Sequence, residues 1–391
     1  MKRVVLLIVL ALIVIALVAC QPGARKAYGG VIKIGHVAPL TGDIPKVGEE
    51  GKYALEMWLE DLDKAGGIEV NGVKYKVQVI HEDNESKAES AAAATTKLIT
   101  EDKVLAIIGP YASKQAIPAG EVADRLKTPL ISPWSTNPRT TKGRPFVFRA
   151  AFLDDFQGRV VAKFIKEEFG ATKVAVLYDV ASDYPKGLAE FFKQGAEEQG
   201  MQVVAFESFT TKDRDFSAQL TKIINSGAEV LFTPQYYDEV PLIVKQAHQL
   251  GWNKPIVGSD SWGSPELMNL CGDDCVGSFF STHWAVAGAK GAAKEFIDRF
   301  QQKYGYAPGD VAALAWDSAH LLEQAIKDCG KLTGNLEQDR KCIRDALANI
   351  KEFNGITGKM KFNEEGDPIK CAVIVRINEN HEFEFYKQAC P

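Results

Sequence analysis

Two strand-to-helix corners in the first half of the chain carry side chains that can hold an anion. An apolar run at 104–108 ends in Gly109-Pro110-Tyr111-Ala112-Ser113, and a helical pattern follows. Glycine lets a ligand approach the backbone closely, and the free N–H groups at the start of a helix attract a group such as a carboxylate. The hydroxyl of Ser113 would add a donor, although a plain helix N-cap explains the same serine.

The second corner follows the short apolar run 130–131 and reads Ser132-Pro133-Trp134-Ser135-Thr136-Asn137-Pro138. This loop offers hydroxyl groups, free carbonyl oxygens and one large indole ring. Trp134 fits a pocket wall and a core position equally well. Because ligands of open α/β sheets bind at the carboxyl ends of strands, a site is expected at such corners.

An alternation of strand and helix patterns positions these corners. Segments read in turn as strands and helices at 31–37, 51–62, 75–80, 86–99, 104–108, 114–125 and 130–131, and then at 156–169, 173–178, 186–199, 202–206, 216–224, 230–233, 239–249 and 256–257. Strands that are apolar on both faces need helices on both sides of a parallel sheet. Two such series, 31–150 and 155–282, predict an α/β protein with two doubly wound lobes. Residues 291–350 are expected to be mostly helical, and 372–386 to form a hairpin.

The N-terminus has the pattern of a lipoprotein signal. Lys2 and Arg3 precede sixteen apolar residues, 4–19, which as a helix would rise about 24 Å and are marginal for a bilayer span. Leu17-Val18-Ala19-Cys20 reads as a lipobox, in which Cys20 is acylated and becomes the new N-terminus. We therefore expect residues 1–19 to be removed and 20–30 to tether the chain outside the cytoplasm. An uncleaved anchor helix is the alternative.

Composition excludes several classes of protein. The chain has 391 residues, 46% of them apolar and 25% charged, which is typical of a globular protein of two domains. Its net charge of −5 and its lack of basic clusters argue against a nucleic-acid partner. No nucleophile-elbow, zinc-protease, dinucleotide or phosphate-loop motif occurs, so we expect neither a cofactor nor a catalytic residue. A hydrolase that uses paired carboxylates leaves no such signature and stays an alternative.

The cysteines favour disulfides. Seven are present, and acylation of Cys20 leaves six for an oxidising compartment. Fifteen pairings are possible, and proximity in the chain favours Cys271–Cys275, Cys329–Cys342 and Cys371–Cys390. No Cys-x-x-Cys occurs and the six histidines are scattered, so no metal site is expected.

An ordered set of short motifs resembles the type I periplasmic solute-binding proteins of ABC importers, in particular the branched-chain amino-acid-binding (Leu/Ile/Val-binding) branch. The matching segments are 34–42, 65–68, 108–110 with Ser113, 131–133 with 136–138, 146–149, Asp179 with Tyr184 and 187–189, and 215–217. The resemblance implies two Rossmann-like lobes joined by three crossings and closing on a solute. Lobe 1 would comprise 31–150 and 284–369, and lobe 2 would comprise 151–283 and 370–391.

The resemblance also implies which residues hold the solute. Amino-acid binders of this family use positions that match Ser113, Thr136 and the backbone at Trp134 from lobe 1, and Tyr236 and Asp260 from lobe 2. Helix N–H groups and hydroxyls suit a carboxylate, and Asp260 suits an ammonium group. Both charges of the solute would therefore be paired only when the lobes close. Further pocket candidates are Ser135, Tyr184 and Tyr111.

Three departures from the family pattern put leucine or valine as the ligand in doubt. Trp134 stands where small residues are usual, Val47 stands where an aromatic ring often covers the ligand, and Asp260 replaces a commoner glutamate. The leading hypothesis is a monomeric, lipid-anchored receptor that delivers an amino acid or similar small molecule to an ABC permease in the membrane. The alternative is a sensor-type binding protein for an amide, an aromatic or another small carboxylate solute.

Overall fold

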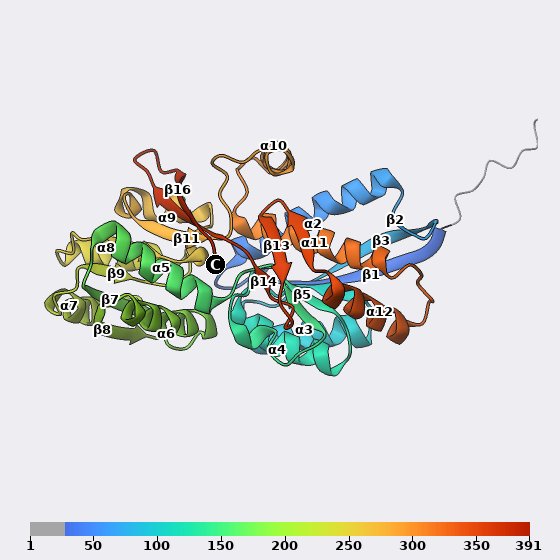
Figure 1. Cartoon of the computed structure of the whole chain (residues 1–391), viewed down its shortest axis with the longest axis horizontal. Helices are drawn as coiled ribbons and strands as arrows, with labels where there is room; N and C mark the ends of the chain where they lie inside the picture. The colour runs from blue at the N-terminus through green and yellow to red at the C-terminus, as the bar shows by residue number, and fades with distance from the viewer. Residues whose placement is uncertain (1–27) are drawn as a thin grey trace, which may run out of the picture.

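The computed structural model describes residues 28–391, which form two lobes, each built on its own β-sheet (Figure 1). The first lobe has a six-stranded sheet in the order β2-β3-β1-β4-β5-β6. All neighbouring strands in it are parallel except β2 and β3. The strands are β1 (Tyr28–Ala38), β2 (Ile68–Val70), β3 (Val73–Asp83), β4 (Ala106–Ile108), β5 (Leu130–Ser132) and β6 (Val147–Arg149).

The second lobe has a seven-stranded sheet in the order β16-β15-β11-β10-β9-β7-β8. Strands β7 to β11 are parallel to their neighbours, whereas β15 and β16 form an antiparallel hairpin on β11. The bounds are β7 (Lys173–Asp179), β8 (Gln202–Phe209), β9 (Val230–Phe232), β10 (Ile256–Gly258), β11 (Phe279–Thr282), β15 (Ala372–Ile377) and β16 (Phe383–Ala389). The short central strands β9 and β10 are buried along their whole length, as parallel strands covered on both faces should be.

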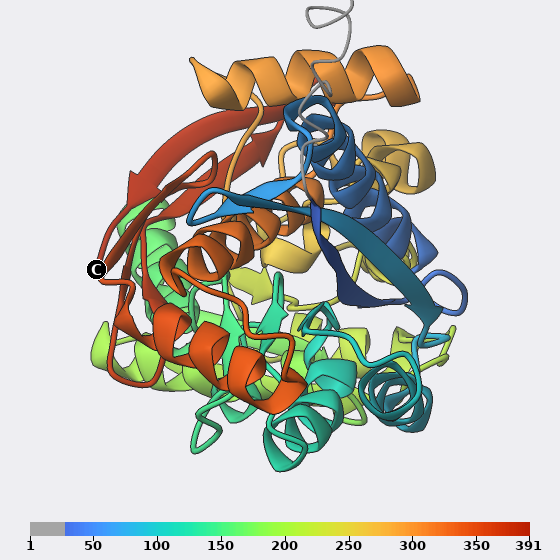
Figure 2. The ribbon, with the colours of Figure 1, turned by 90° about the vertical axis from the view of Figure 1, so that its right-hand side faces the viewer.

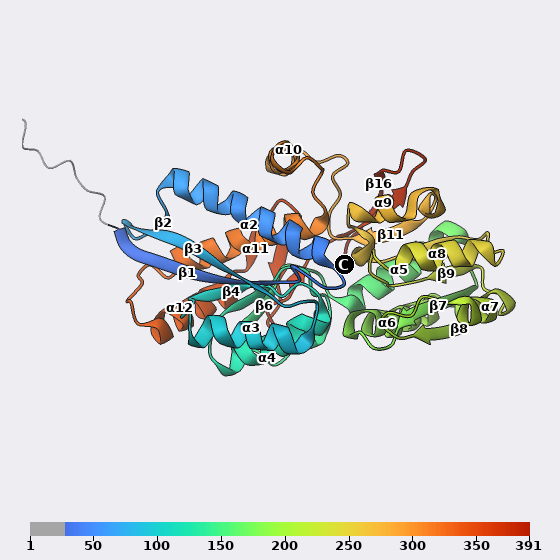
Figure 3. The ribbon, with the colours of Figure 1, turned by 180° about the vertical axis from the view of Figure 1, so that it is seen from behind.

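Helices lie on both faces of each sheet (Figures 1 and 3). The first lobe has α2 (Pro45–Ala65), α3 (Ala88–Thr100), α4 (Ser113–Arg125), α11 (Asp310–Asp328) and α12 (Leu336–Asn349). The second lobe has α5 (Asp154–Phe169), α6 (Asp183–Glu198), α7 (Ser217–Asn225), α8 (Val240–Gln249) and α9 (Glu266–Cys271). The predicted fold class, two doubly wound α/β lobes, is confirmed. Helix α2 begins six residues before the predicted start, because Pro45 suits a first helical turn, where no N–H partner is needed.

The chain passes between the two sheets three times: from β6 to α5, from β11 to α11, and from β14 (Pro368–Ile369) to β15. The second passage carries α10 (Ala292–Tyr304), which lies across α2 (Figure 2). Tyr53 and Tyr304 stack there with ring centroids 3.8 Å apart, and Arg299 pairs with Asp61 at 2.7 Å. A small sheet of β12 (Glu352–Gly355), β13 (Gly358–Phe362) and β14 was not predicted. The residue limits given above for the two lobes stay a prediction.

Three disulfides join Cys271 to Cys275, Cys329 to Cys342 and Cys371 to Cys390, the pairs that proximity favours. The second connects the end of α11 to α12, and the third fastens the start of β15 to the end of β16. The signal, Cys20 and most of the tether lie outside the described residues. Among the helices of residues 28–391, none is long and apolar enough to cross a membrane.

Candidate functional site

One small cavity between the lobes gathers five of the predicted site residues. Its free space is about 150 Å³, and its lining is almost sealed from solvent. The side chains come from corners that follow β4, β5, β9 and β10 and from the first turn of α6. The cavity is lined by Ala112, Ser113 and Trp134 from the first lobe and by Tyr184, Tyr236 and Asp260 from the second.

The wall from the first lobe is the start of α4 together with the loop after β5. Ala112 is the N-cap residue of α4 and no side chain caps this helix, so the N-cap interpretation of Ser113 is wrong. Instead, the Ser113 hydroxyl lies 2.9 Å from the Ser135 hydroxyl, which lies 2.7 Å from that of Thr140. The first N–H groups of a helix have no partner within the helix. This wall therefore presents N–H donors and a fixed hydroxyl, as a carboxylate requires.

Arg149, buried at the end of β6, holds the loop after β5 in place. Its guanidinium donates to the carbonyl oxygens of Ser135 at 2.7 Å and Asn137 at 2.8 Å, and to the Thr141 hydroxyl at 2.7 Å. Its Nε lies 2.7 Å from the carboxylate of Asp367, and both side chains are buried. The sequence pointed to Arg149 only as part of a motif, because its anchor Asp367 is more than two hundred residues away.

Asp260 is the centre of the second lobe's contribution. Its Oδ1 accepts hydrogen bonds from Tyr184 at 2.6 Å and from Gln157 Nε2 at 2.7 Å, and His283 Nε2 lies 3.3 Å from its Oδ2. Asp260 therefore does not cap its own turn, which was the alternative interpretation of this acid. Gln157 and His283 were not predicted, because each is at least 23 residues from Asp260 in the chain and neither belongs to a motif.

The surroundings of the cavity are acidic. Burial raises the pKa of Asp154 well above its ordinary value, and the charge of Asp260 raises it further. Burial and the same charge raise the pKa of Asp310 to about 7. Burial lowers the pKa of His283, so its imidazole is neutral at pH 7. None of the described residues that line the cavity is a lysine or arginine. This end of the site therefore suits a cationic group.

Three aromatic rings flank the same space. The ring centroids of Trp134 and Tyr236 lie 6.0 Å apart, and those of Tyr184 and Tyr236 lie 5.4 Å apart. Burial, together with the charge of Asp260, raises the pKa of both tyrosines, so their hydroxyls stay protonated. The indole of Trp134 is only 4% exposed and takes up space that a smaller residue would leave free.

The remaining predicted residues lie outside the cavity lining. Tyr111 is fully buried, and its hydroxyl lies 2.9 Å from Nε2 of His36 in the core of the first lobe. Gly51 of α2 passes so close to this phenol that a Cβ there would overlap it. Ser135 stands behind Ser113, and Thr136 faces Asp154. The pattern that singled out Tyr111 gives its place in the chain but not the direction of its side chain.

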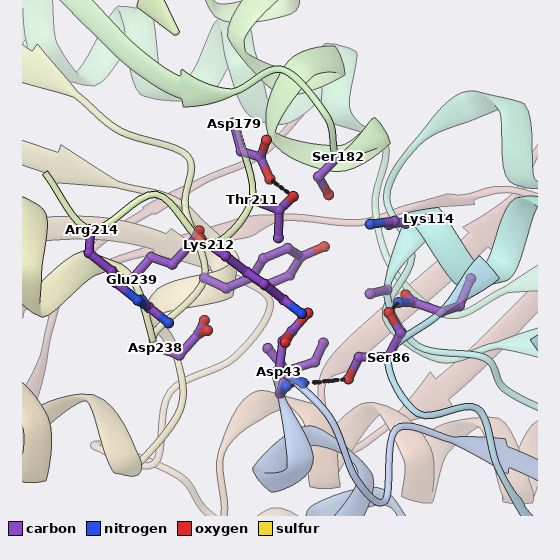
Figure 4. A pocket seen from close by; sticks show the side chains of 14 residues that line it. Asp43, Ser86, Lys114, Asp179, Ser182, Thr211, Lys212, Arg214, Asp238 and Glu239 are labelled. Atoms are coloured by element: carbon purple, nitrogen blue, oxygen red, sulfur yellow. Dashed lines mark hydrogen bonds between the residues drawn. The ribbon is translucent and has the colours of Figure 1, made fainter. Parts of the chain in front are cut away.

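The mouth of the site is a second space, of about 510 Å³, which shares Ala112 and Tyr236 with the cavity (Figure 4). Charged side chains reach into it from both lobes, including Lys114 from the first and Lys212 and Glu239 from the second. A solute that reaches the cavity by this route must pass between the lobes.

Contacts between the lobes hold the structure closed. The N–H of Lys46, in the first turn of α2, donates to the hydroxyl of Tyr237 at 3.3 Å. In addition, Arg139 of the first lobe pairs with Asp183 of the second at 2.9 Å, and the Asn137 amide donates to the Asp183 carbonyl at 3.0 Å. None of these contacts requires a solute.

Glu50 fastens the corner at which α11 begins, next to the site. Its Oε1 accepts the N–H of Gly309 at 2.7 Å, and burial raises its pKa to about 8. The folded chain thus keeps a proton on Glu50 that the unfolded chain releases above about pH 4.5. The free energy of unfolding should therefore fall as pH rises from about 4.5 to 8, by at most about 1.4 kcal/mol per pH unit from this group.

We expect Glu50→Gln to remove this part of the pH dependence, because the amide cannot ionise. Urea unfolding of the wild type and the variant at pH 5.5, 6.5 and 7.5 measures the difference. Glu295→Gln, at an exposed position of α10, is the matched control and should keep the wild-type slope. A wild-type slope in Glu50→Gln would contradict the role of Glu50.

No metal centre is found among residues 28–391, in which no group of three or more His, Cys, Asp or Glu side chains is placed to hold an ion. Helix N–H groups and Ser113 on one wall and Asp260 on the other give the cavity the features of a binding site for a small solute with an anionic end and a cationic end. The cavity lies at the carboxyl ends of strands from both sheets, which is where α/β sheets bind their ligands.

Comparison with known proteins places this geometry in context. A family model described as periplasmic binding protein matches residues 31–382. A leucine-, isoleucine-, valine-, threonine- and alanine-binding protein of Pseudomonas aeruginosa is 29% identical over 337 residues, which cover 86% of this chain and 87% of the relative.

Two solved structures are also similar. A leucine binding protein from Thermotoga maritima superposes with a TM-score of 0.85 at 33% identity, over 92% of this chain and 99% of the other. A branched-chain amino acid transporter substrate binding protein from Streptococcus pneumoniae, solved in complex with isoleucine, has a TM-score of 0.83 at 32% identity, over 92% and 100% of the two chains.

Proposed function

The chain belongs to the periplasmic binding protein family, and on this premise we propose that it captures a small amino acid between its lobes and releases it to an ABC permease. The observation that carries the proposal is the cavity that both lobes line. N–H groups and Ser113 stand on one side of it, and Asp260 stands on the other. A zwitterion removed from water needs a partner for each charge, because an unpaired buried charge costs several kcal/mol.

The relatives support the choice of ligand. The Pseudomonas protein is named for five amino acids with small or branched aliphatic side chains, and the Streptococcus structure holds isoleucine. Here the indole of Trp134 takes up space between the lobes and leaves a narrow cavity, so we favour the smaller members of that set, alanine, threonine and valine. We expect no turnover of the bound solute.

The site of action that we propose is the outer face of a membrane. The basic start, the apolar run 4–19 and the lipobox at Cys20 favour a lipid anchor, and the tether 20–30 would leave both lobes free to move. The partner would be a permease of an ABC importer, with the binding protein acting as a monomer. Sensing in place of transport is the alternative role for the same lobes.

Titration calorimetry of the chain with L-alanine, L-threonine, L-valine, L-leucine and benzoate tests the proposal. A micromolar dissociation constant, about −8 kcal/mol, is expected for at least one amino acid. Small-angle scattering with and without that amino acid should show a more compact solute-bound form. If benzoate alone binds, the aromatic-acid alternative replaces the amino acid, and if no solute binds, the proposal fails.

Trp134→Ala should change which solutes bind. Removing the indole enlarges the cavity beside Tyr236, so the affinity for L-phenylalanine relative to L-alanine should rise at least tenfold, or about 1.4 kcal/mol. Calorimetry with the two amino acids measures the ratio. Trp134→Phe, which keeps an aromatic wall, is the control and should shift the ratio less. An unchanged ratio in Trp134→Ala would mean that the indole only packs in the lobe.

A further inference from the structure

A second groove between the lobes shares no lining residue with the cavity or its mouth. It consists of two adjoining spaces, of about 1180 Å³ and 290 Å³, that have five lining residues in common. We call it the hinge groove, because its lining includes Val286, in the passage from β11 to α11. The larger space is wide at the surface, and the smaller one leads inward to Asp310 and Trp284.

The walls of the hinge groove are apolar and come from both lobes. Pro265, Met268 and Phe383 belong to the second lobe, and Pro308 lies just before α11 of the first. Val286 is 36% exposed, which leaves apolar surface uncovered on the groove's edge. An apolar body placed here would therefore touch both lobes at once.

The lining of the hinge groove is mostly acidic, and its one basic side chain among the described residues, His381, already pairs with Asp273 outside the groove. Asp310 lies at the inner end, 3% exposed, and Glu382 and Glu384 lie at the rim. Thr282 donates to Oδ2 of Asp310 at 2.9 Å, and Oδ1 lies beside Gly263, which lines both spaces of the groove. Among the described residues that line the groove, no lysine or arginine balances these carboxylates. Apolar walls between carboxylates at both ends favour a cation with an apolar body.

We propose that the hinge groove is a second binding site, which takes a small organic ammonium ion with an alkyl or aryl body. The ammonium group would lie toward Asp310, and the body would lie against Met268, Pro308 and Phe383. The groove shares no lining residue with the cavity that the amino acid would occupy, and Asp310 lies between the two spaces.

Binding in the groove should also favour closure of the lobes. The distance between the two walls of the groove depends on how the lobes are placed relative to each other. A molecule that fits both walls in this closed structure therefore stabilises the closed form. This second half of the proposal rests on the proposed function. The amine and the amino acid should raise each other's affinity by the same factor, because coupling between two sites is reciprocal.

Calorimetry with 2-phenylethylammonium as the probe tests the site, and 2-phenylethanol is its neutral counterpart. We expect the amine to bind at least tenfold more tightly than the alcohol. Ala287→Trp, which places an indole in the groove from an exposed loop, should weaken amine binding at least tenfold. Ala292→Trp, on α10 outside the groove, is the matched control and should not. Glu382→Gln with Glu384→Gln should also weaken the amine, and Glu379→Gln should not.

Asp260→Asn separates the groove from the cleft. Amine binding that is kept in Asp260→Asn and lost in Ala287→Trp supports the groove, whereas the opposite result would place the amine in the cleft and overturn the proposal. Equal binding of amine and alcohol, or no amine binding, would also overturn it. Saturating amine should lower the dissociation constant of the amino acid at least fivefold, and competition between the two would refute the coupling. If no amino acid binds, the proposed function fails, and the amine data still decide whether the groove is a site.

Discussion

Replacing Asp260 by asparagine is expected to weaken the binding of an amino acid at least tenfold. The carboxylate is 1% exposed, and it is the acid that lines the cavity opposite the start of α4. Removing one partner of a buried charge pair costs about 2–5 kcal/mol, because the other charge is left unpaired. Asparagine keeps the size of the side chain and can still accept from Tyr184 and Gln157, so the fold should be unaffected.

Calorimetry with the tightest amino acid measures this loss, and thermal unfolding checks the fold. Asp298→Asn is the matched control, because Asp298 pairs with Lys294 at an exposed position of α10 and lines neither the cavity nor its mouth. The control should change affinity less than twofold. Equal affinities in the wild type and Asp260→Asn would remove this acid from the site.

Replacing Arg149 by methionine should lower the free energy of unfolding by about 3–5 kcal/mol. The guanidinium is fully buried, pairs with Asp367 and donates to two carbonyl oxygens of the loop that carries Trp134. Methionine would leave a buried carboxylate without its partner, which is strongly destabilising. The loop would also lose its anchor, so binding should weaken together with stability.

Urea unfolding measures the first effect, and Arg159→Met is the control. Arg159 is half exposed in its ion pairs with Asp155 and Glu198, and such pairs contribute less than about 1 kcal/mol. Arg149→Met with Asp367→Asn should recover part of the loss, because no buried charge is left unpaired. A loss below 1 kcal/mol in Arg149→Met would contradict the role given to this ion pair.

The features that could be predicted from the sequence are those with a local signal. The central strands are short apolar runs, and apolar residues recur with a period of about 3.6 residues in the helices. The alternation of these two patterns along the chain predicts both sheets. Ser113 and Trp134 could be placed at strand ends for the same reason, and parallel topology brings such ends to one edge of a sheet. Asp260 was predicted from the resemblance to the family and not from a local pattern. The small sheet β12-β13-β14 could not be predicted, because its strands are short and contain many polar residues, as loops also do.

Contacts between residues that are distant in the chain could not be predicted. Asp260 receives hydrogen bonds from Gln157 and His283, and Arg149 pairs with Asp367, without any spacing pattern that relates them. The direction in which a side chain points could not be predicted either. Tyr111 and Ser113 are two residues apart in one corner, yet the phenol turns into the core beside His36 while Ser113 lines the cavity.

The hydrogen bond from Lys46 to Tyr237 and the ion pair of Arg139 with Asp183 join the lobes without touching the solute cavity. They lower the free energy of the shut conformation of the empty protein, and so determine what fraction of empty molecules is already shut. Each apparent dissociation constant depends on that fraction. Loss of the Tyr237 hydroxyl would accordingly weaken all solutes by a common factor and leave their order of preference unchanged.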